Sequence, residues 1–410
     1  MRKGALLTAS LLLPAAMAFS AGFQINVQGV RQLAMGGTGV ATPWDVSTLF
    51  YNPAGLSSLR SMQAYGSVSF LLVRTSYVQT PTYGYREDAK PGFYTPFNLY
   101  VGGPLRQNDR IGVGIGIYTP FGSGITWDDN WEGKFVTQSV KLQSFFIQPT
   151  VSYKISDAVS IGAGFVYALG KVELNRALPV QDASGRDATA SLEGGANGIG
   201  FNAGIQVRAS ESIRLGLTYR SQVNMEVDKG DATFNVPSSL RPNFPNTSFS
   251  SELPLPSVTT LGIAYKPIDD LTLQFDVNYV GWSAYKSLKF DYEHNTSVLQ
   301  DTEAPRNYEN KATFRLGAHY MINDRISVMA GGAYDPTPVA DNYVSPDLPD
   351  ANHWTASAGA TFRINEQWSA LGALEYNTTV KRNSVYLPDN FAGRYQTKVL
   401  VPSIGVTYDF

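Results

Sequence analysis

The sequence predicts an all-β protein, a transmembrane antiparallel β-barrel of about 14 strands with an N-terminal hatch (plug) inside its lumen. Three observations lead to this prediction: an N-terminal export signal, alternating segments joined by a recurring short turn, and a stretch near the start that does not alternate. The predicted domains are a signal peptide at residues 1–20, the hatch at residues 21–60 and the barrel at residues 61–410.

The composition excludes several classes of protein. Lys and Arg number 32 against 34 Asp and Glu, so the net charge of −2 favours no polyanion and nucleic-acid binding is not expected. Charged residues make up 16% of the chain, against about 25% in soluble domains. The chain has no Cys, which excludes thiolate metal sites and thiol catalysis, and only three widely spaced His. We therefore expect neither a metal nor a cofactor.

The N-terminus has the pattern of a secretory signal peptide. Two cations precede an apolar run from Ala5 to Leu13, and small residues follow. Cleavage after Ser20 would leave Ala21 as the mature N-terminus, and cleavage after Ala18 is the alternative. The apolar run is shorter than the ~20 residues of a membrane helix, and no later stretch approaches that length. The exported chain is therefore periplasmic, secreted or an outer-membrane barrel.

Alternation of apolar and polar residues favours the barrel. From Leu271 to Tyr279, every odd position is apolar and every even position is polar. Successive side chains of a strand point to opposite faces, so one face would meet lipid and the other a polar interior. One such strand could equally belong to a soluble sandwich. Repetition of the pattern is what points to a barrel.

A short turn, with an aromatic residue before it and Asp, Asn or Glu within it, supplies that repetition. Asn and Asp suit tight turns, and the aromatic residue fits an interfacial girdle. With strands at 62–77 and 394–410, the turns account for about fourteen strands. The four clear copies are Tyr153–Asp157, Tyr265–Asp270, Tyr320–Asp324 and Phe362–Glu366, and the looser copies are Pro104–Asp109 and Ala209–Ser212.

The connections at the other end of the strands are expected to be long and polar, at residues 179–197, 228–254, 291–306 and 336–352. Short turns on one side and long loops on the other are typical of an outer-membrane barrel of a Gram-negative cell. The chain ends in an alternating segment that closes on Phe410, which resembles the signal read by the barrel-assembly machinery. The expected partners therefore include this machinery, outer-membrane lipids and lipopolysaccharide.

Glycines follow the same period of two. Gly112, Gly114 and Gly116 share one face of a predicted strand, as do Gly162 and Gly164. A phosphate-binding loop would need a strand–loop–helix context, which is absent here. Lumen-facing glycines make room for something inside the barrel, and close strand packing is the alternative.

Residues 21–60 do not alternate, and we expect them inside the lumen rather than free in the periplasm. A barrel of about fourteen strands encloses more space than its own side chains fill. The apolar residues that need covering are Leu33, Met35, Trp44, Leu49, Phe50 and Tyr51.

At this point the sequence resembles the FadL/TodX family of outer-membrane transporters for hydrophobic substrates. The resemblance covers essentially the whole mature chain. It is carried by Ala21-Gly22-Phe23-Gln24, Asn52-Pro53-Ala54, Tyr118-Thr119-Pro120-Phe121-Gly122, Asp335–Val339 and the terminal Tyr408-Asp409-Phe410.

The resemblance implies a 14-stranded barrel closed by an N-terminal hatch, which takes up long-chain fatty acids or aromatic hydrocarbons without an energy source. Substrate would enter an extracellular groove, pass to an apolar interior pocket and leave sideways where the third strand kinks. Pro and Gly both weaken a ladder, which independently predicts an interruption at that kink. By resemblance the pocket residues are Ala21, Gly22 and Phe23, the hatch motif is Asn52, Pro53 and Ala54, and the kink lies near Pro120, Phe121 and Gly122.

Two cations are expected, again by resemblance, to meet a fatty-acid carboxylate. They are Arg176, at the end of a strand that begins after Ser160, and Lys311. The alternative is that both are ordinary lumen charges, paired with Glu173 and Glu309. These cations favour a carboxylated lipid, although aromatic hydrocarbons stay open as substrates.

An enzyme is not expected. The chain has no Gly-x-Ser-x-Gly elbow, and His294 and His353 fall in predicted loop regions, whereas a catalytic nucleophile needs a base within reach. A general porin for hydrophilic solutes would need an open lumen, which the predicted hatch argues against.

Overall fold

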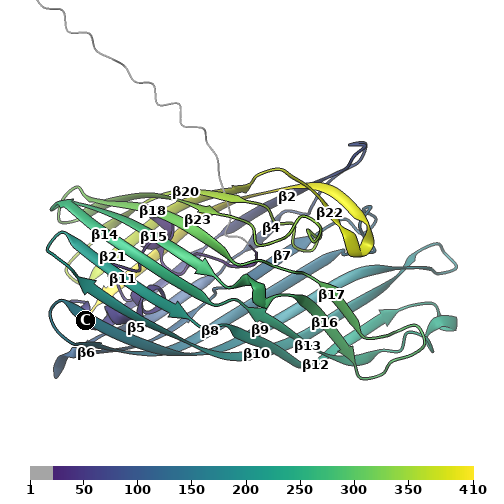
Figure 1. Ribbon diagram of the computed structural model, residues 1–410, viewed down its shortest axis with the longest axis horizontal. Coiled ribbons are helices and arrows are strands. Elements are labelled where there is room, and N and C mark those ends of the chain that lie inside the picture. Colours follow the sequence, from purple (N-terminus) through teal and green to yellow (C-terminus); the bar gives the residue numbers. More distant parts are fainter. Residues whose placement is uncertain (1–21) are drawn as a thin grey trace, which may run out of the picture.

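The structure is a computed structural model, and it describes residues 22–410. The predicted signal peptide, its cleavage after Ser20 and the expected N-terminus Ala21 lie outside these described residues. Figure 1 shows an antiparallel barrel whose strands surround a short N-terminal segment. The wall has 14 strands, which confirms the predicted fold class.

Several wall strands are divided into shorter segments where the pairing is interrupted. The helical elements are α1 (Val30–Ala34), α2 (Thr48–Tyr51), η1 (Pro53–Ser58), η2 (Ser238–Leu240), η3 (Trp282–Ala284) and η4 (Leu387–Asp389). The strand segments are β1 (Gln63–Ser69), β2 (Leu71–Gln79), β3 (Arg86–Asp88), β4 (Gly92–Tyr94), β5 (Phe97–Leu105), β6 (Asn108–Tyr118), β7 (Gly122–Thr126), β8 (Ser139–Lys154), β9 (Val159–Gln181), β10 (Asp187–Arg208), β11 (Ile213–Arg220), β12 (Val223–Asn235), β13 (Thr247–Leu255), β14 (Val258–Ile268), β15 (Leu271–Val280), β16 (Ser287–Tyr292), β17 (Thr302–Pro305), β18 (Lys311–Met321), β19 (Ile326–Asp335), β20 (His353–Arg363), β21 (Trp368–Thr379), β22 (Arg382–Tyr386) and β23 (Phe391–Asp409).

The barrel closes by pairing of its first and last strands. β1 runs antiparallel to β23 from the Gln63–Asp409 pair to the Ser69–Ser403 pair. The strand predicted at 62–77 is interrupted at Phe70, beside Pro402, which has no N–H to donate. All six predicted short turns lie between consecutive strands, which confirms them. Among the described residues no helix is both long enough and apolar enough to cross a bilayer.

The two faces of the wall are those that the alternation predicts. In β15, Leu273 and Phe275 are exposed on the outside, whereas Gln274 and Asp276 are buried on the inside. The aromatic residues before the short turns are exposed as well, as a girdle requires. They are Tyr153, Tyr265, Tyr320 and Phe362.

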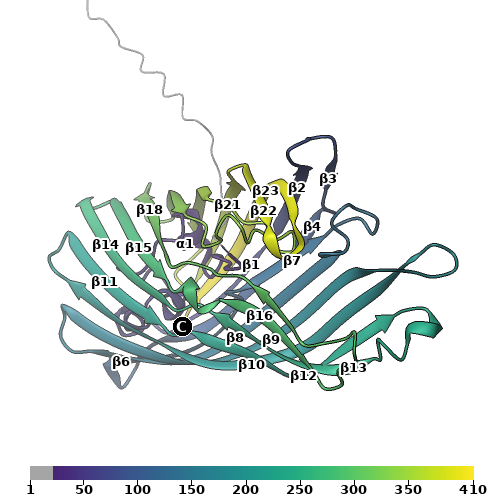
Figure 2. The same ribbon diagram turned by 45° about the vertical axis from the view of Figure 1, so that its right-hand side comes forward.

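Three of the four predicted long loops are shorter than expected, because strand pairing continues into them. β9 and β10 have 23 and 22 residues, and only residues 182–186 connect them, so the prediction of a loop at 179–197 is wrong. The β12–β13 and β16–β17 connections likewise shrink to residues 236–246 and 293–301. A strand needs about 9–11 residues to cross a bilayer, so β9 and β10 extend beyond it (Figure 2). In the extension of β10 the inner face carries the buried Ala188 and Ala190 and the outer face is polar, which is the reverse of a lipid-crossing strand.

Residues 22–59, which we call the hatch segment, lie inside the barrel and are largely buried. Wall glycines allow this close approach: a Cβ on Gly162 would collide with the backbone of Pro53, and one on Gly204 would collide with Asn52. Gly114 likewise faces Leu49. The lumen-facing glycines thus make room for the hatch segment.

Candidate substrate pathway

The wall is interrupted where the kink was expected. β6 ends at Tyr118 and β7 begins at Gly122, and both pair with β8. Tyr118 is opposite Phe146 and Gly122 is opposite Gln143, so the interrupted strand takes four steps where β8 takes three. One extra residue of this kind is a β-bulge, which bends a strand and leaves backbone groups outside the ladder.

The hatch segment pairs with this interruption from the inside. The Ile25 N–H donates to the Pro120 carbonyl (2.9 Å), and the Gly122 N–H donates to the Phe23 carbonyl (3.0 Å). Between them Gln24 and Phe121 form an antiparallel bridge. Backbone groups that the bulge removes from the wall therefore bond to the first residues of the hatch segment.

On its other side β7 has no ladder to a neighbouring strand within the described residues. β5 pairs with β6 only as far as Asn98 and Tyr118. The Tyr94 ring crosses the gap, and a Cβ on Gly124 would collide with it. A hydrogen bond from the Lys90 N–H to the carbonyl of Thr126 bounds the gap at one end (2.7 Å). Side chains rather than backbone hydrogen bonds close the wall between β4 and β7.

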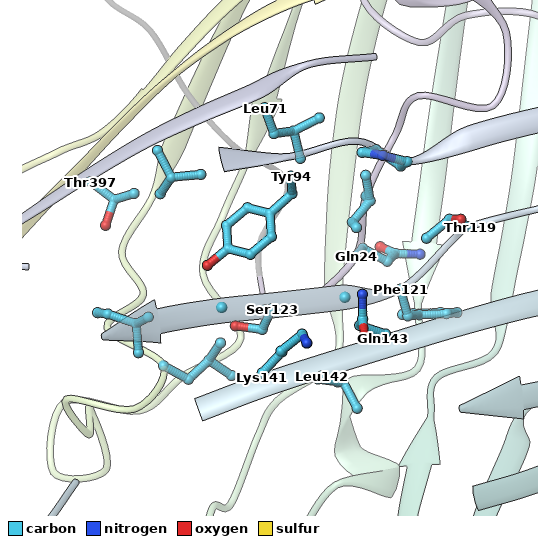
Figure 3. Close-up of a pocket in the computed structure, with 18 of the residues that line it drawn as sticks. Gln24, Leu71, Tyr94, Thr119, Phe121, Ser123, Lys141, Leu142, Gln143 and Thr397 are labelled. Atoms are coloured by element: carbon cyan, nitrogen blue, oxygen red, sulfur yellow. The ribbon is translucent and has the colours of Figure 1, made fainter. Parts of the chain in front are cut away.

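A cavity of about 540 Å³, which we call the wall cavity, lies at this gap (Figure 3). Its lining includes the outward-facing Phe93 and Phe145, and also Thr397 and His353, which are buried on the inner side. Figure 3 shows the Tyr94 ring directed towards β7 across it. Because neighbouring residues of a strand point to opposite faces, a lining drawn from both faces means that the cavity passes through the wall.

A smaller cavity of about 90 Å³, which we call the inner cavity, adjoins it inside the barrel. Ser123, Leu142, Gln143, Asp347 and Leu348 line both cavities and so mark their junction. Most of the inner lining is apolar. It includes Phe23, Val140, Val172, Leu174, Met225, Leu253, Leu255, Leu288 and Phe290.

Phe23 is packed in an aromatic cluster beside the inner cavity and is only 3% exposed. Its ring centroid lies 4.9 Å from that of Trp282, 5.8 Å from that of Tyr285 and 6.0 Å from that of Phe121. Tyr308 packs edge-on against Tyr285 (5.0 Å). The start of the hatch segment is therefore held by the ring of Phe121 at the β6–β7 break. The rings of Trp282 and Tyr285, which lie between β15 and β18, hold it from the other side.

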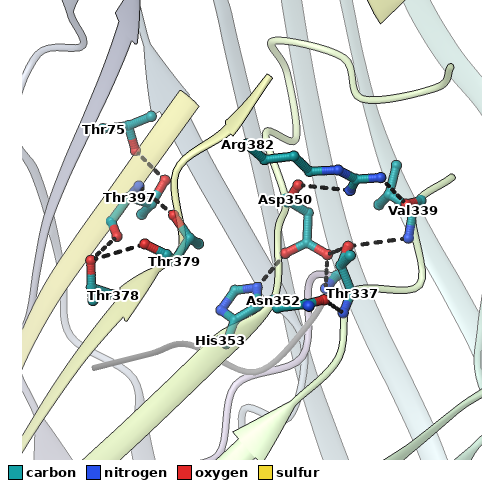
Figure 4. A network of polar contacts seen from close by, with 11 residues as sticks. Thr75, Thr337, Val339, Asp350, Asn352, His353, Thr378, Thr379, Arg382 and Thr397 are labelled. Atoms are coloured by element: carbon teal, nitrogen blue, oxygen red, sulfur yellow. Dashed lines mark hydrogen bonds and ion pairs between the residues drawn. The ribbon is translucent and has the colours of Figure 1, made fainter. Parts of the chain in front are cut away.

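The β19–β20 loop, residues 336–352, lines both cavities, and a polar network anchors it (Figure 4). The Asp350 carboxylate accepts from the Thr337 hydroxyl, contacts the His353 ring and accepts from the Gly22 N–H (3.3 Å). Arg382 donates to the Asp350 carbonyl (3.3 Å). The start of the hatch segment and this loop therefore share one carboxylate.

A second anchor of the loop is the ion pair between Arg306 and Asp347 (2.6 Å). Burial would raise the pKa of Asp347, but the guanidinium of Arg306 and hydrogen bonds outweigh it and hold this pKa below its usual value. The indole of Trp127 donates to the Pro346 carbonyl (3.0 Å). These contacts hold the loop within the mouth of the barrel.

The hatch motif connects the hatch segment to the wall. Asn52 is fully buried, and its amide donates to the carbonyls of Val40 (2.9 Å) and Ile205 (3.0 Å), the latter on β10. Its side-chain oxygen accepts from the Ala54 N–H (3.2 Å) at the start of η1. Pro53 follows at the first position of η1, where its missing N–H is not needed.

The two predicted carboxylate ligands stand at the inward face of separate strands, and neither lines the two cavities. Arg176 is exposed, two residues beyond the cavity-lining Leu174 on the same face of β9. Lys311 forms an ion pair with Glu309 (2.7 Å), which is the expected alternative. Glu173 pairs with lysines of β8 and β9 instead of with Arg176.

Among the described residues, no group of three or more His, Asp or Glu side chains is placed to hold a metal ion. The candidate site combines apolar surface, a small number of anchoring polar residues and a gap in the wall.

The sequence matches the family described as Outer membrane protein transport protein (OMPP1/FadL/TodX) over residues 11–410. The chain belongs to this family. The protein is therefore an outer-membrane transporter of hydrophobic compounds and not an enzyme. The family resemblance of the sequence is confirmed.

Individual relatives agree with this assignment. The chain is 27% identical to the long-chain fatty acid transport protein of Escherichia coli O6:H1, with 88% of each chain covered. It is 25% identical to outer membrane protein P1 of Haemophilus influenzae, covering 89% of this chain and 87% of that one.

Solved structures show the same fold. A crystal structure of a Pseudomonas aeruginosa FadL homologue has a TM-score of 0.81 at 22% identity, covering 95% of this chain and all (100%) of that one. The Pseudomonas putida toluene transporter TodX has a TM-score of 0.73 at 16% identity, covering 93% and 98%.

Sequence reasoning missed part of the pathway. It did not identify the cluster around Phe23, the junction residue Ser123 or the role of Asp350. Trp282 and Tyr285 lie close together in the sequence, which could have indicated an aromatic cluster there. Nothing local marks Asp350, because its partner Gly22 is 328 residues away.

Proposed function

We propose that this protein takes up long-chain fatty acids by passive diffusion. Substrate enters at the extracellular mouth, occupies the inner cavity and leaves sideways through the wall cavity at the β6–β7 break. The observation that carries this proposal is the lining of the wall cavity, which comes from both faces of the wall and shares Ser123, Leu142 and Leu348 with the inner cavity.

A sideways exit suits an apolar cargo. Each CH₂ group gains about 0.8 kcal/mol when it leaves water, so an alkyl chain of about 15 methylenes would lose roughly 12 kcal/mol on entering an aqueous lumen. A gap in the wall delivers the chain directly to the hydrocarbon of the bilayer. The cost of the missing ladder bonds is reduced because the backbone of Phe23 and Ile25 bonds to the break.

Two features favour a fatty acid over a small aromatic hydrocarbon. The wall cavity of about 540 Å³ is in the range of drug-sized ligand sites, more room than a single benzene ring needs. Arg176 lies beyond Leu174 at the rim of the inner cavity, where we propose that it meets a carboxylate, with Lys311 on the inward face of β18. The aromatic cluster around Phe23 would also suit benzene rings, so aromatic hydrocarbons are the second candidate.

We also propose that the hatch segment closes the lumen to hydrophilic solutes, with Asn52, Pro53 and Ala54 as its attachment to the wall. Planar-bilayer recordings should then show no large, steady ionic conductance. A steady conductance of porin size would favour the general-porin alternative.

The junction of the cavities offers a direct test of the route. Ser123 faces inward on β7, opposite Leu142, so Ser123→Trp places an indole between the two cavities. Thr126→Trp adds the same bulk on the same strand, but Thr126 is exposed and lines neither cavity. Uptake of radiolabelled oleate by cells should fall at least tenfold for Ser123→Trp and stay unchanged for Thr126→Trp.

Binding of ligand to purified Ser123→Trp should persist at the extracellular mouth, and heat-modifiable gel mobility should show that both variants are folded. Oleate uptake at the original rate by folded Ser123→Trp would show that the route does not pass this junction. Loss of toluene uptake with retained oleate uptake would instead assign the route to aromatic hydrocarbons.

A further inference from the structure

The outer wall carries a cationic patch that the transport pathway does not use. It surrounds a cavity of about 840 Å³ beside β2, β3 and β23. The acidic residues in its lining are Glu87, Asp88 and Asp128. The basic residues, which we call the cationic patch, are Arg74, Arg86, Lys90, Lys381, Arg394 and Lys398.

The core of the patch, which is the pair Arg74 and Lys398, faces outward. In β2, Thr75 and Tyr77 are buried on the inner side, so Arg74, which directly precedes Thr75, points out and is exposed. Arg74 is directly opposite Lys398 in the β2–β23 ladder. Directly opposite residues have Cβ atoms about 4.5–5.5 Å apart, and like charges in such pairs are destabilising. This pair therefore favours an anion between the two side chains.

Protein carboxylates do not neutralise this core. Within the described residues, Arg74, Lys381 and Lys398 have no carboxylate within 4.0 Å, whereas Arg86 pairs with Asp88 (2.7 Å). The guanidinium of Arg394 lies over the ring of Tyr83 (5.2 Å) rather than against an acid. Several cations thus remain available to an external ligand.

The patch lies where the lipid-facing surface ends. On the outer face of β23, Leu400 and Ile404 follow Lys398, and on β2, which runs the opposite way, the exposed Leu72 precedes Arg74. Phe93, opposite Leu72, is 61% exposed. In Figure 2, β2, β3 and β23 rise towards the end of the barrel that lies away from the C-terminus. The longer loops lie at this same end. The cations therefore meet the outer leaflet at the level of its headgroups.

We propose that the cationic patch binds the phosphorylated sugar headgroup of the outer-leaflet glycolipid, lipopolysaccharide. Guanidinium groups bind phosphate oxygens through paired, charge-assisted hydrogen bonds, and ammonium groups bind them as point charges. The cavity of about 840 Å³ has room for more than one phosphate group. The apolar surface below, at Leu72, Leu400 and Phe93, lies against the acyl chains of the same molecule.

The test removes the opposed pair with Arg74→Gln/Lys398→Gln and compares it with Lys229→Gln/Arg241→Gln, which removes two exposed charges from the extracellular region outside the patch. Native mass spectrometry of the detergent-solubilised protein would measure binding of diphosphoryl lipid A, monophosphoryl lipid A and inorganic phosphate. We expect the patch variant to bind diphosphoryl lipid A at least tenfold more weakly, and the control variant to bind it as the unaltered protein does.

Monophosphoryl lipid A should bind the unaltered protein more weakly than the diphosphoryl form, and inorganic phosphate at millimolar concentration should not displace either lipid. Equal lipid A binding by both double variants would overturn the proposal, as would complete displacement by inorganic phosphate, which would indicate a site for free anions. The single variant Lys398→Gln, compared with Arg241→Gln, provides the same comparison if the double variant does not fold.

Discussion

Replacing Asn52 by Ala should loosen the hatch segment while the barrel stays folded. The Asn52 amide makes three hydrogen bonds, to the carbonyls of Val40 and Ile205 and from the N–H of Ala54. Only the bond to Ile205 reaches a wall strand, and that carbonyl belongs to a ladder residue of β10. The variant therefore removes the attachment of the motif without removing any wall pairing.

The magnitude follows from the bond to Ile205, because the other two bonds lie within the hatch segment. A hydrogen bond contributes about 0.5–1.5 kcal/mol net. Since about 1.4 kcal/mol corresponds to a factor of ten, the released population should rise roughly two- to tenfold. The Val40 carbonyl keeps a donor in the variant, because the Gln206 amide also donates to it (3.0 Å).

Hydrogen–deuterium exchange by mass spectrometry would follow residues 22–59 and the wall strands separately. In Asn52→Ala, hatch-segment amides should exchange faster by that factor, whereas wall amides and heat-modifiable mobility should not change. Asn108→Ala, at an exposed turn where Asn108 accepts from the Arg110 N–H, is the control and should leave hatch exchange unaltered. Unchanged hatch protection in Asn52→Ala would refute the reasoning, as would equal loss of protection throughout the barrel.

Two further predictions concern charge. Changing Arg176 and Lys311 together to Ala should weaken binding of a fatty acid by roughly 10-fold or more, because hydrogen bonds to charged groups are worth about 1.5–3 kcal/mol. The same change should leave binding of a neutral alkane unaltered. Equal losses for both ligands in a binding assay would mean that the cations only support structure. Because Arg306 and hydrogen bonds hold the pKa of Asp347 below its usual value, their pairing stabilises the loop above the ordinary carboxyl range and is lost only as pH falls through the lowered pKa. Trp127 fluorescence beside this loop should therefore stay constant from about pH 8 to about pH 5 and change only in stronger acid, and a transition near pH 6 would contradict this assignment.

Local patterns in the sequence were sufficient for the barrel. Alternation predicts both faces of β15, and Asn and Asp predict the short turns, because these features depend on neighbouring residues alone. The lumen-facing glycines Gly114 and Gly162 indicated an occupied interior, because a missing side chain leaves room only for something close to the backbone.

Other features were decided only by the closed barrel. The extension of β10 alternates in the reverse sense, with Ala188 and Ala190 buried inside and polar residues outside, so it does not resemble a lipid-crossing strand. The bonds of Phe23 to the β6–β7 break and of Gly22 to Asp350 join residues far apart in the chain. Short-range patterns encode the backbone of each strand, whereas barrel closure sets which distant side chains meet. The wall cavity therefore belongs to the tertiary structure, and no single segment of the sequence encodes it.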